Sequence, residues 1–139
     1  MPPPYYKRGM TIPDAYFAGI IDGEGHVGLH ARSGKKYVTS MVPVVEVKMT
    51  DKAVILALKE RFGGSFWMKK PGLPHHKVQW RWRVQDRTAG VVISALREFL
   101  IVKAKDADAI MDYLATSEER KRRSPAVLRE RRAATARGL

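Results

Sequence analysis

The stretch from Tyr16 to Val27, YFAGIIDGEGHV, brings a helical pattern together with three closely spaced glycines and two carboxylates. Pro13 and Asp14 stand just before it. Proline suits the first turn of a helix, and an acid suits the positive end of the helix dipole. We therefore expect a helix that begins near Pro13, runs to about Asp22 and ends at Gly23 or Gly25, because glycine favours helix ends.

Two glycines of this helix lie on one face, because Gly19 and Gly23 are four residues apart. A glycine inside a helix costs about 1 kcal/mol relative to alanine. Close approach of another helix would offset that cost, since small residues at this spacing let two backbones touch. The spacing occurs in one segment, so the partner is expected to be a second copy. The two Glu24 side chains would then lie near the two-fold axis of a homodimer.

Two carboxylates beside a symmetry axis repel each other, so each needs a nearby cation. Oxygen ligands suit Mg²⁺, which proteins hold through one or two carboxylates together with phosphate and water. A metal at Glu24 beneath a basic surface would describe a site for cleaving phosphodiesters.

The charge of the chain favours a polyanionic partner. Twenty-six Lys and Arg residues against fourteen Asp and Glu give a net charge of +12, which is typical of nucleic-acid binders. A basic solubilising surface, or a partner at a membrane surface or in the ribosome, is the alternative. The absence of cysteine excludes disulfides and thiolate metal sites. No apolar run approaches the roughly 20 residues of a membrane span, so we expect no membrane partner and a soluble, intracellular protein.

The order of the predicted elements indicates an α+β fold. Alternating apolar and polar residues predict strands at 26–32, 44–49, 65–70 and 77–85. Helices are expected at 50–64, with Gly63 as the stop, at 88–102 and at 105–116. Two hairpins with helices between them predict one antiparallel sheet covered by helices on its apolar face. We divide the chain into a flexible leader (1–12), one domain (13–115) and a basic C-terminal extension (116–139).

The opposite face of this sheet would carry an unusual number of hydrogen-bond donors. Arg and Gln suit bidentate contacts with guanine and adenine edges, and a two-stranded ribbon fits the major groove. An ordinary solvated face is the alternative. Trp67, Trp80 and Trp82 are expected in the core with the valines. The residues expected to contact DNA are His26, His30, Arg32, Lys35, Lys36, Lys48, Lys70, Gln79, Arg81, Arg83 and Gln85.

The segment Phe17 to Gly25, FAGIIDGEG, resembles the nine-residue signature of the LAGLIDADG homing endonucleases, with Glu24 in the place of the final acid. Glutamate is a known variant there. The segment EFLIVKAKDAD is similar to the one that carries the family's active-site lysine, which falls on Lys103. The resemblance covers about residues 14–115. It implies an αββαββα core with a saddle-shaped sheet, and a homodimer on a long, roughly palindromic double-stranded DNA target.

The resemblance also implies roles for single residues. Glu24 and the backbone carbonyl of Gly23 would bind Mg²⁺ or Mn²⁺, and Glu24 and Lys103 would be catalytic. Asp22 would hold the helix end. A polar residue near the start of the second helix would complete the pocket, with Lys48, Thr50 and Asp51 as candidates. The implied dimer interface consists of Phe17, Gly19, Ile20 and Gly23.

Two other functions fit parts of the sequence. A protein of the same fold could bind DNA or RNA without cleavage, as a regulator or an intron maturase. Loss of the metal-binding acids would favour that interpretation, and both acids are present. A basic RNA- or ribosome-binding module of another fold would leave the DGEG segment unexplained. Bacterial or phage cytoplasm, or an organelle, is the expected location.

Overall fold

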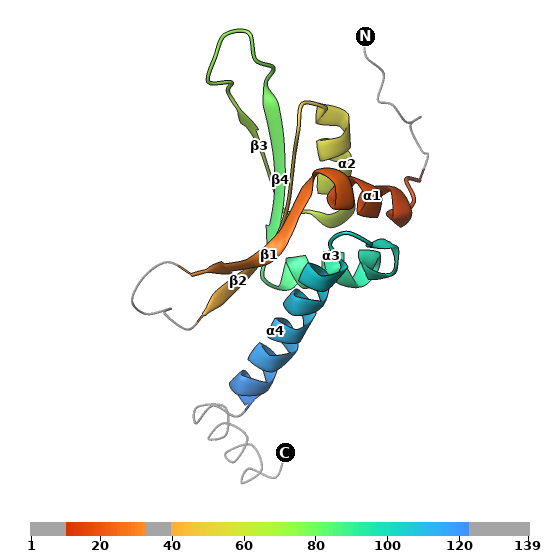
Figure 1. The fold of residues 1–139 in the computed structure, drawn as a ribbon, viewed down its shortest axis with the longest axis vertical. Helices are drawn as coiled ribbons and strands as arrows, with labels where there is room; N and C mark the ends of the chain where they lie inside the picture. Colours follow the sequence, from red (N-terminus) through yellow and green to blue (C-terminus); the bar gives the residue numbers. More distant parts are fainter. Residues whose placement is uncertain (1–10, 33–39, 123–139) are drawn as a thin grey trace, which may run out of the picture.

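The computed structural model describes residues 11–32 and 40–122, and these form four α-helices, one short 3₁₀ helix and four strands (Figure 1). In chain order the elements are α1 (Asp14–Glu24), β1 (Gly25–Ala31), β2 (Met41–Met49), α2 (Lys52–Phe62), β3 (Ser65–Lys69), β4 (Gln79–Gln85), α3 (Arg87–Leu96), the 3₁₀ helix η2 (Arg97–Phe99) and α4 (Ala104–Arg122).

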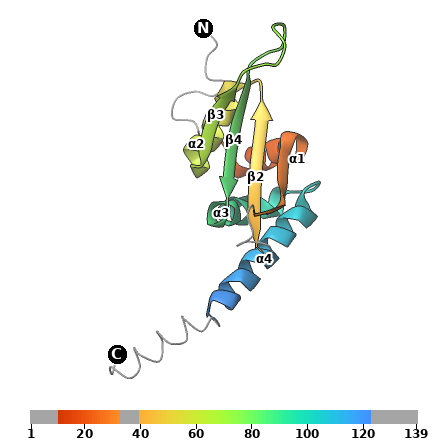
Figure 2. The same ribbon diagram turned by 90° about the vertical axis from the view of Figure 1, so that its left-hand side faces the viewer.

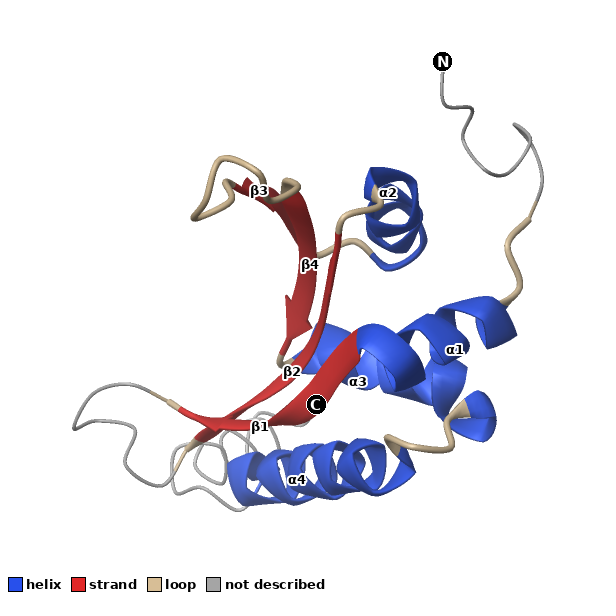
Figure 3. Cartoon of the chain, turned by 45° about the horizontal axis from the view of Figure 1, so that its top comes forward, coloured by secondary structure: helices blue, strands red, loops and turns tan. Residues whose placement is uncertain are grey.

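The four strands make one antiparallel sheet in the order β1-β2-β4-β3. Helices α1, α2 and α3 pack on one face of this sheet, and the sheet curves so that its opposite, hollow face carries no described helix (Figures 2 and 3). The predicted α+β layer, with helices on the apolar face only, is therefore confirmed.

The core lies between the sheet and the helices, and Trp82 of β4 is at its centre. Trp82 is fully buried and donates a hydrogen bond from Nε1 to the carbonyl of Gly63 at 2.7 Å. Gly63 has a φ of +74°, a conformation that favours glycine, and it ends α2 as predicted. Val45 and Val47 of β2 are buried beside Trp82, as their alternation predicted.

Helix α1 ends at Gly25 rather than at Gly23. A Cβ atom at Gly25 would lie 2.7 Å from the carbonyl oxygen of Ile21, so only glycine fits where the chain turns from α1 into β1. A Cβ atom at Gly23 would meet nothing within 4 Å. The glycine that the turn requires is therefore Gly25.

Three expectations about the elements are wrong in detail. The helix expected at 88–102 ends at Leu96, and η2 follows, because Asp22 holds residues 101–103 in another conformation. Helix α4 continues past Thr116 to Arg122 without a break. Trp67 is opposite Arg81 in the pairing of β3 with β4, so its side chain lies on the polar face and not with the core valines.

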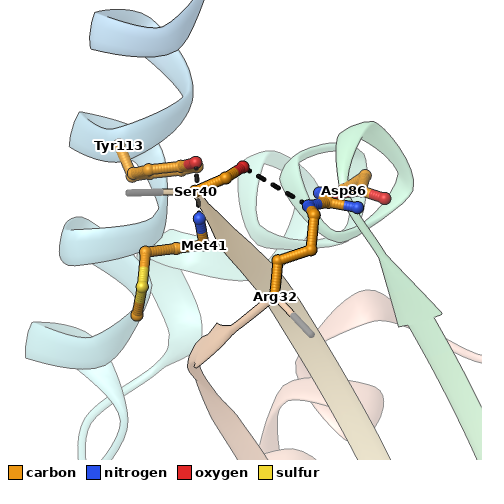
Figure 4. A network of polar contacts seen from close by, with 5 residues as sticks. All are labelled: Arg32, Ser40, Met41, Asp86 and Tyr113. Atoms are coloured by element: carbon orange, nitrogen blue, oxygen red, sulfur yellow. Dashed lines mark hydrogen bonds and ion pairs between the residues drawn. The ribbon is translucent and has the colours of Figure 1, made fainter. Parts of the chain in front are cut away.

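A polar network joins the far end of the first hairpin to two helices (Figure 4). Arg32 pairs with Asp86 at 2.9 Å and donates to the Ser40 hydroxyl at 3.3 Å. The backbone N–H of Met41 donates to the hydroxyl oxygen of Tyr113 on α4 at 2.9 Å, and this hydrogen bond lowers the pKa of Tyr113 below its usual value. Asp86 has a φ of +55°, a strained conformation that the contacts with Arg32 offset.

None of the described helices is long and apolar enough to span a membrane.

Candidate active site

Glu24, the last residue of α1, presents an exposed carboxylate at the junction with β1. Within residues 11–32 and 40–122, no cation pairs with this carboxylate and no donor hydrogen-bonds to it. The last carbonyl groups of a helix carry partial negative charge. The carboxylate and the helix end together therefore attract a cation.

Asp22 lies two residues earlier, and both of its carboxylate oxygens accept hydrogen bonds. Oδ2 accepts the backbone N–H of Ile101 at 2.7 Å, and Oδ1 accepts the backbone N–H of Lys103 at 3.0 Å. Burial raises the pKa of Asp22, but the N–H groups of Ile101, Lys103 and Val102 lower it by more, so the pKa lies below its ordinary value. Asp22 therefore ties the end of α1 to the segment that precedes α4.

This tie brings Lys103 to the same helix end. Its ammonium group donates to the backbone carbonyl of Asp22 at 3.5 Å, and its side chain is partly buried. Lys103 and Glu24 are 79 positions apart in the sequence, yet both lie at the C-terminal end of α1. The structure thus places the two residues for which the resemblance implies catalysis at one helix end, with Lys103 in contact with Asp22.

The start of α2 narrows the choice of the third pocket residue. Asp51 caps this helix, since its Oδ1 accepts the backbone N–H groups of Ala53 at 3.0 Å and Val54 at 3.3 Å. Its Oδ1 atom therefore serves the helix cap. Lys48 and Thr50 are exposed, and they stay candidates for the pocket.

The end of α1 offers oxygen atoms of the kind that a hard divalent cation prefers, namely the exposed Glu24 carboxylate and the last backbone carbonyl groups of the helix, that of Gly23 among them. A single chain supplies little else. In the described part of the chain, no three His, Asp or Glu side chains cluster in a way that could hold a metal ion. A metal at Glu24 would need further ligands from phosphate, water or a second copy.

The exposed face of α1 contains two glycines, Gly19 and Gly23. Gly19 and Gly23 are exposed, and a Cβ atom on either would meet nothing within 4 Å in the same chain. Tyr16 and Ile20 lie on the same face by their spacing, exposed and half-buried respectively. Phe17 does not: it is 2% exposed and packs against Phe62 in the core, with ring centroids 5.9 Å apart.

Two large apolar side chains are highly exposed in the segment that Asp22 binds. Ile101 is 83% exposed and Val102 is 70% exposed. Their backbone is held at the end of α1 by Asp22, so the exposure is a consequence of that tie. Exposed apolar residues next to one another are a mark of protein–protein contact.

The strand register gathers most of the predicted DNA-binding residues on the hollow face of the sheet. Residues paired directly across antiparallel strands point to the same side, and the pairs include His26 with Glu46, Glu46 with Arg83, Lys48 with Arg81, and Trp67 with Arg81. We call this surface the polar face. It holds His26, His30, Glu46, Lys48, Ser65, Trp67, Lys69, Gln79, Arg81, Arg83 and Gln85.

Two histidines of the polar face are in direct contact. Nε2 of His26 and Nε2 of His30 are 2.7 Å apart. Gly28 between them leaves room, since a Cβ atom there would come within 3.3 Å of the His26 ring. The pair lies on β1, the strand that follows Glu24.

Other predicted contact residues lie elsewhere. Arg32 is bound to Asp86 and Ser40 and so serves the network at the hairpin end. Lys35 and Lys36 lie outside the described residues. Lys70 follows the end of β3, and together with Gln79 of the polar face it lines a hollow of about 500 Å³ near the loop between β3 and β4.

This hollow is basic, and the sequence pattern identified only part of it. Besides Lys70 and Gln79, it is lined by Lys69, Lys77, His75, His76 and Thr50. The turn-rich segment PGLPHH signals a loop but gives no indication that the loop folds over the strand ends. A cluster of ammonium and imidazole groups in a concave site suits phosphate.

No family model matches the chain, and no curated protein matches it by sequence. Solved structures do match its fold. The homing endonuclease I-CvuI, in complex with its target, superposes with a TM-score of 0.66 at 20% identity, over 84% of this chain and 73% of that chain. The archaeal intron-encoded homing endonuclease I-Vdi141I, complexed with DNA, gives a TM-score of 0.62 at 18% identity, over 84% of this chain and 76% of that chain.

The LAGLIDADG homing endonuclease I-GzeII, in complex with its DNA target, gives a TM-score of 0.64 at 18% identity. The match covers 84% of this chain but 40% of that chain. At identities of 18–20%, this structural similarity establishes the fold but not the activity. The chain has the fold of the LAGLIDADG homing endonucleases.

Proposed function

We propose that the protein is a site-specific DNA endonuclease of the LAGLIDADG type, which makes a double-strand break by metal-dependent hydrolysis as a homodimer. The observation that carries the proposal is the convergence of Glu24 and Lys103 at the end of α1, where the polar face begins. Glu24 pairs with no cation in the described part of the chain, so it is available to a metal ion, and Lys103 adds a positive charge from a distant segment. A metal ion and an ammonium group are two means of stabilising the charge that develops in phosphodiester hydrolysis.

Each residue of the site has a task that follows from its contacts. Glu24, with the carbonyl group of Gly23, would bind Mg²⁺ or Mn²⁺. A bound divalent cation supplies charge stabilisation at the phosphate and lowers the pKa of a coordinated water. Lys103 places an ammonium group where charge develops on the scissile phosphate. Asp22 fixes the backbone of Lys103 and so orients it.

The homodimer is supported by the open face of α1. Gly19 and Gly23 leave space that the same chain does not fill, and Ile101 and Val102 add apolar area beside it. A two-fold axis along this face would place two Glu24 carboxylates near each other, one for each DNA strand.

Double-stranded DNA is the proposed partner because the polar face is long, basic and made of strands. Its Arg and Gln side chains suit base edges in the major groove, and the basic hollow at the β3–β4 end suits a backbone phosphate. A regulator or maturase of the same fold would use the same surface without Glu24 and Lys103.

The test is in vitro selection of cleaved sites from a randomised duplex library, with Mg²⁺ or with EDTA. We expect one long, roughly palindromic site to be enriched with Mg²⁺ and none with EDTA. Glu24→Gln should keep the binding affinity for that site and lose cleavage, whereas Glu60→Gln, at an exposed position on α2, should cleave as the original protein does. Binding without cleavage under every metal condition would support the regulator instead.

A further inference from the structure

Glu46 of β2 is the single acid among the described strand residues of the polar face. It lies opposite Arg83 on β4 and opposite His26 on β1. Its side chain is 13% exposed, so it packs against neighbouring residues rather than extending into solvent. A negative charge at this place opposes the attraction of phosphate that the rest of the surface provides.

Each carboxylate oxygen of Glu46 lies near a different arginine. Oε2 lies 3.5 Å from Nη1 of Arg83, and Oε1 lies 3.8 Å from Nη1 of Arg81. Close charge-assisted hydrogen bonds measure about 2.7–2.9 Å. Both pairs are longer than that, so Glu46 holds the two guanidinium groups near it without binding either one tightly.

Arg81 is also largely covered, with its side chain 21% exposed. Its Nε atom is buried and hydrogen-bonds to no group of the described chain. The cross-strand neighbours of Arg81 are Lys48 and Trp67. Glu46, on β2, favours orientations of the Arg81 guanidinium that keep its terminal nitrogens toward that strand.

We propose that Glu46 is a positioning residue for sequence specificity: it holds Arg81 and Arg83 for contact with base edges and limits their contact with phosphates. The inference rests on the proposed DNA binding. A free arginine binds any phosphate and adds affinity that is independent of sequence. An arginine beside a carboxylate gains less binding free energy from a phosphate, because the carboxylate and the phosphate repel each other. The edge of a guanine is neutral and offers two acceptors, so it binds the arginine without that repulsion.

The test is duplex binding by Glu46→Gln, which keeps the shape of the side chain and removes its charge. Glu60→Gln is the matched control, since it changes the net charge equally from α2, on the other side of the sheet. The probes are an arbitrary duplex and the best site that each protein selects from a random duplex pool. Circular dichroism checks that each variant is folded.

Glu46→Gln should bind the arbitrary duplex more tightly than Glu60→Gln does, with a log K against log salt slope steeper by about 0.9 for each additional phosphate that the protein neutralises. Its preference for the selected site should fall at least ~5-fold, the lower range for one bidentate base contact. Replacing guanines of the site with 7-deazaguanine should weaken DNA binding by the original protein more than DNA binding by Glu46→Gln. If Glu46 only stabilised the sheet, 7-deazaguanine should weaken DNA binding by both proteins equally.

Equal behaviour of Glu46→Gln and Glu60→Gln on both probes would overturn the inference and leave the proposed endonuclease standing. If the original protein binds neither probe, the proposed function fails and the inference fails with it. A loss of affinity for the arbitrary duplex in Glu46→Gln would also overturn it, because that result would make Glu46 a support for phosphate contacts.

Discussion

Asp22 accepts the backbone N–H of Ile101 at 2.7 Å, so the end of α1 is fixed to a segment 79 residues away in the sequence. The second carboxylate oxygen of Asp22 accepts the N–H of Lys103. Two carboxylates that look like a pair in the sequence therefore differ in the structure. Asp22 ties two distant segments together, whereas the Glu24 carboxylate is exposed and pairs with no cation in the described part of the chain.

Asp22→Asn should destabilise the fold by about 1–3 kcal/mol at pH 7, since hydrogen bonds to a charged acceptor are the stronger ones. The pKa of Asp22 is lowered in the folded state. Its contribution is therefore complete above the ordinary carboxyl pKa of about 4 and is lost as the pH falls through the lower folded value. Urea unfolding at pH 7, 5 and 3 gives the free energy of unfolding of the original protein and of Asp22→Asn. The difference between these two free energies should become smaller only below about pH 4. Asp112→Asn, at an exposed position on α4, is the control and should show a smaller gap at pH 7.

Lys103→Met should separate cleavage from binding. The backbone hydrogen bond to Asp22 persists in this variant, and only the ammonium group near the end of α1 is lost. We expect single-turnover cleavage to fall about 10²–10³-fold, as for removal of one charge-stabilising group, with little change in DNA affinity. Lys105→Met, at an exposed position in the first turn of α4, is the matched control. Equal cleavage rates for the two variants would remove Lys103 from the catalytic site.

The fold could be predicted from the sequence because its patterns are local. The alternation in β4 separates Trp80 and Trp82 from Arg81 and Arg83 without knowledge of any partner. Strand β3 has no such clear pattern, since Phe66, Trp67 and Met68 are consecutive. Its register with β4 puts Phe66 opposite Trp82 and Trp67 opposite Arg81. The prediction of Trp67 in the core is wrong because this register places Trp67 on the polar face. A shift of one residue would have placed it in the core, and three consecutive apolar residues do not show which register forms.

Non-local contacts explain what the sequence could not show about the site. The roles of Glu46 and Asp51 depend on which groups lie beside them: two arginines on β4, and the first N–H groups of α2. The sequence gives the residue types at these positions but not those neighbours. Only the family resemblance predicts Lys103, and its contact with Asp22 provides the physical reason for its position.

Gly19→Leu should produce a folded monomer. A Cβ atom at this position meets nothing within 4 Å in its own chain, and replacing a helical glycine should stabilise α1 by up to about 1 kcal/mol. The same side chain would prevent a second α1 from approaching at Gly19. Sedimentation should give a dimer mass for the original protein and a monomer mass for Gly19→Leu. Gly72→Leu, which also enters open space but far from α1, should stay dimeric; a dimer of Gly19→Leu would place the interface elsewhere.

Ile101→Asp tests the other part of that surface. The backbone N–H of residue 101 can still bond to Asp22, so the fold should persist, while a charge enters a position that is 83% exposed and apolar. If a second copy covers this position, burying the carboxylate without a cation should weaken the dimer about tenfold or more. Ile101→Thr should weaken it less. An unchanged dimer dissociation constant for Ile101→Asp would show that the segment lies outside the interface.

Lysines of the hollow between β3 and β4 should contribute affinity without sequence preference. Lys69, Lys70 and Lys77 line this hollow with His75 and His76, and neither Glu24 nor Lys103 is among its lining residues, so we expect these lysines to take no part in cleavage. Each Lys→Gln change should flatten the slope of log K against log salt by about 0.9 if that lysine contacts a phosphate. The ratio of affinities for the selected site and an arbitrary duplex should stay constant, because phosphate contacts carry no sequence information. Lys105→Gln on α4 is the control and should leave the slope unchanged. A selective loss of affinity for the selected site would mean that this hollow reads bases.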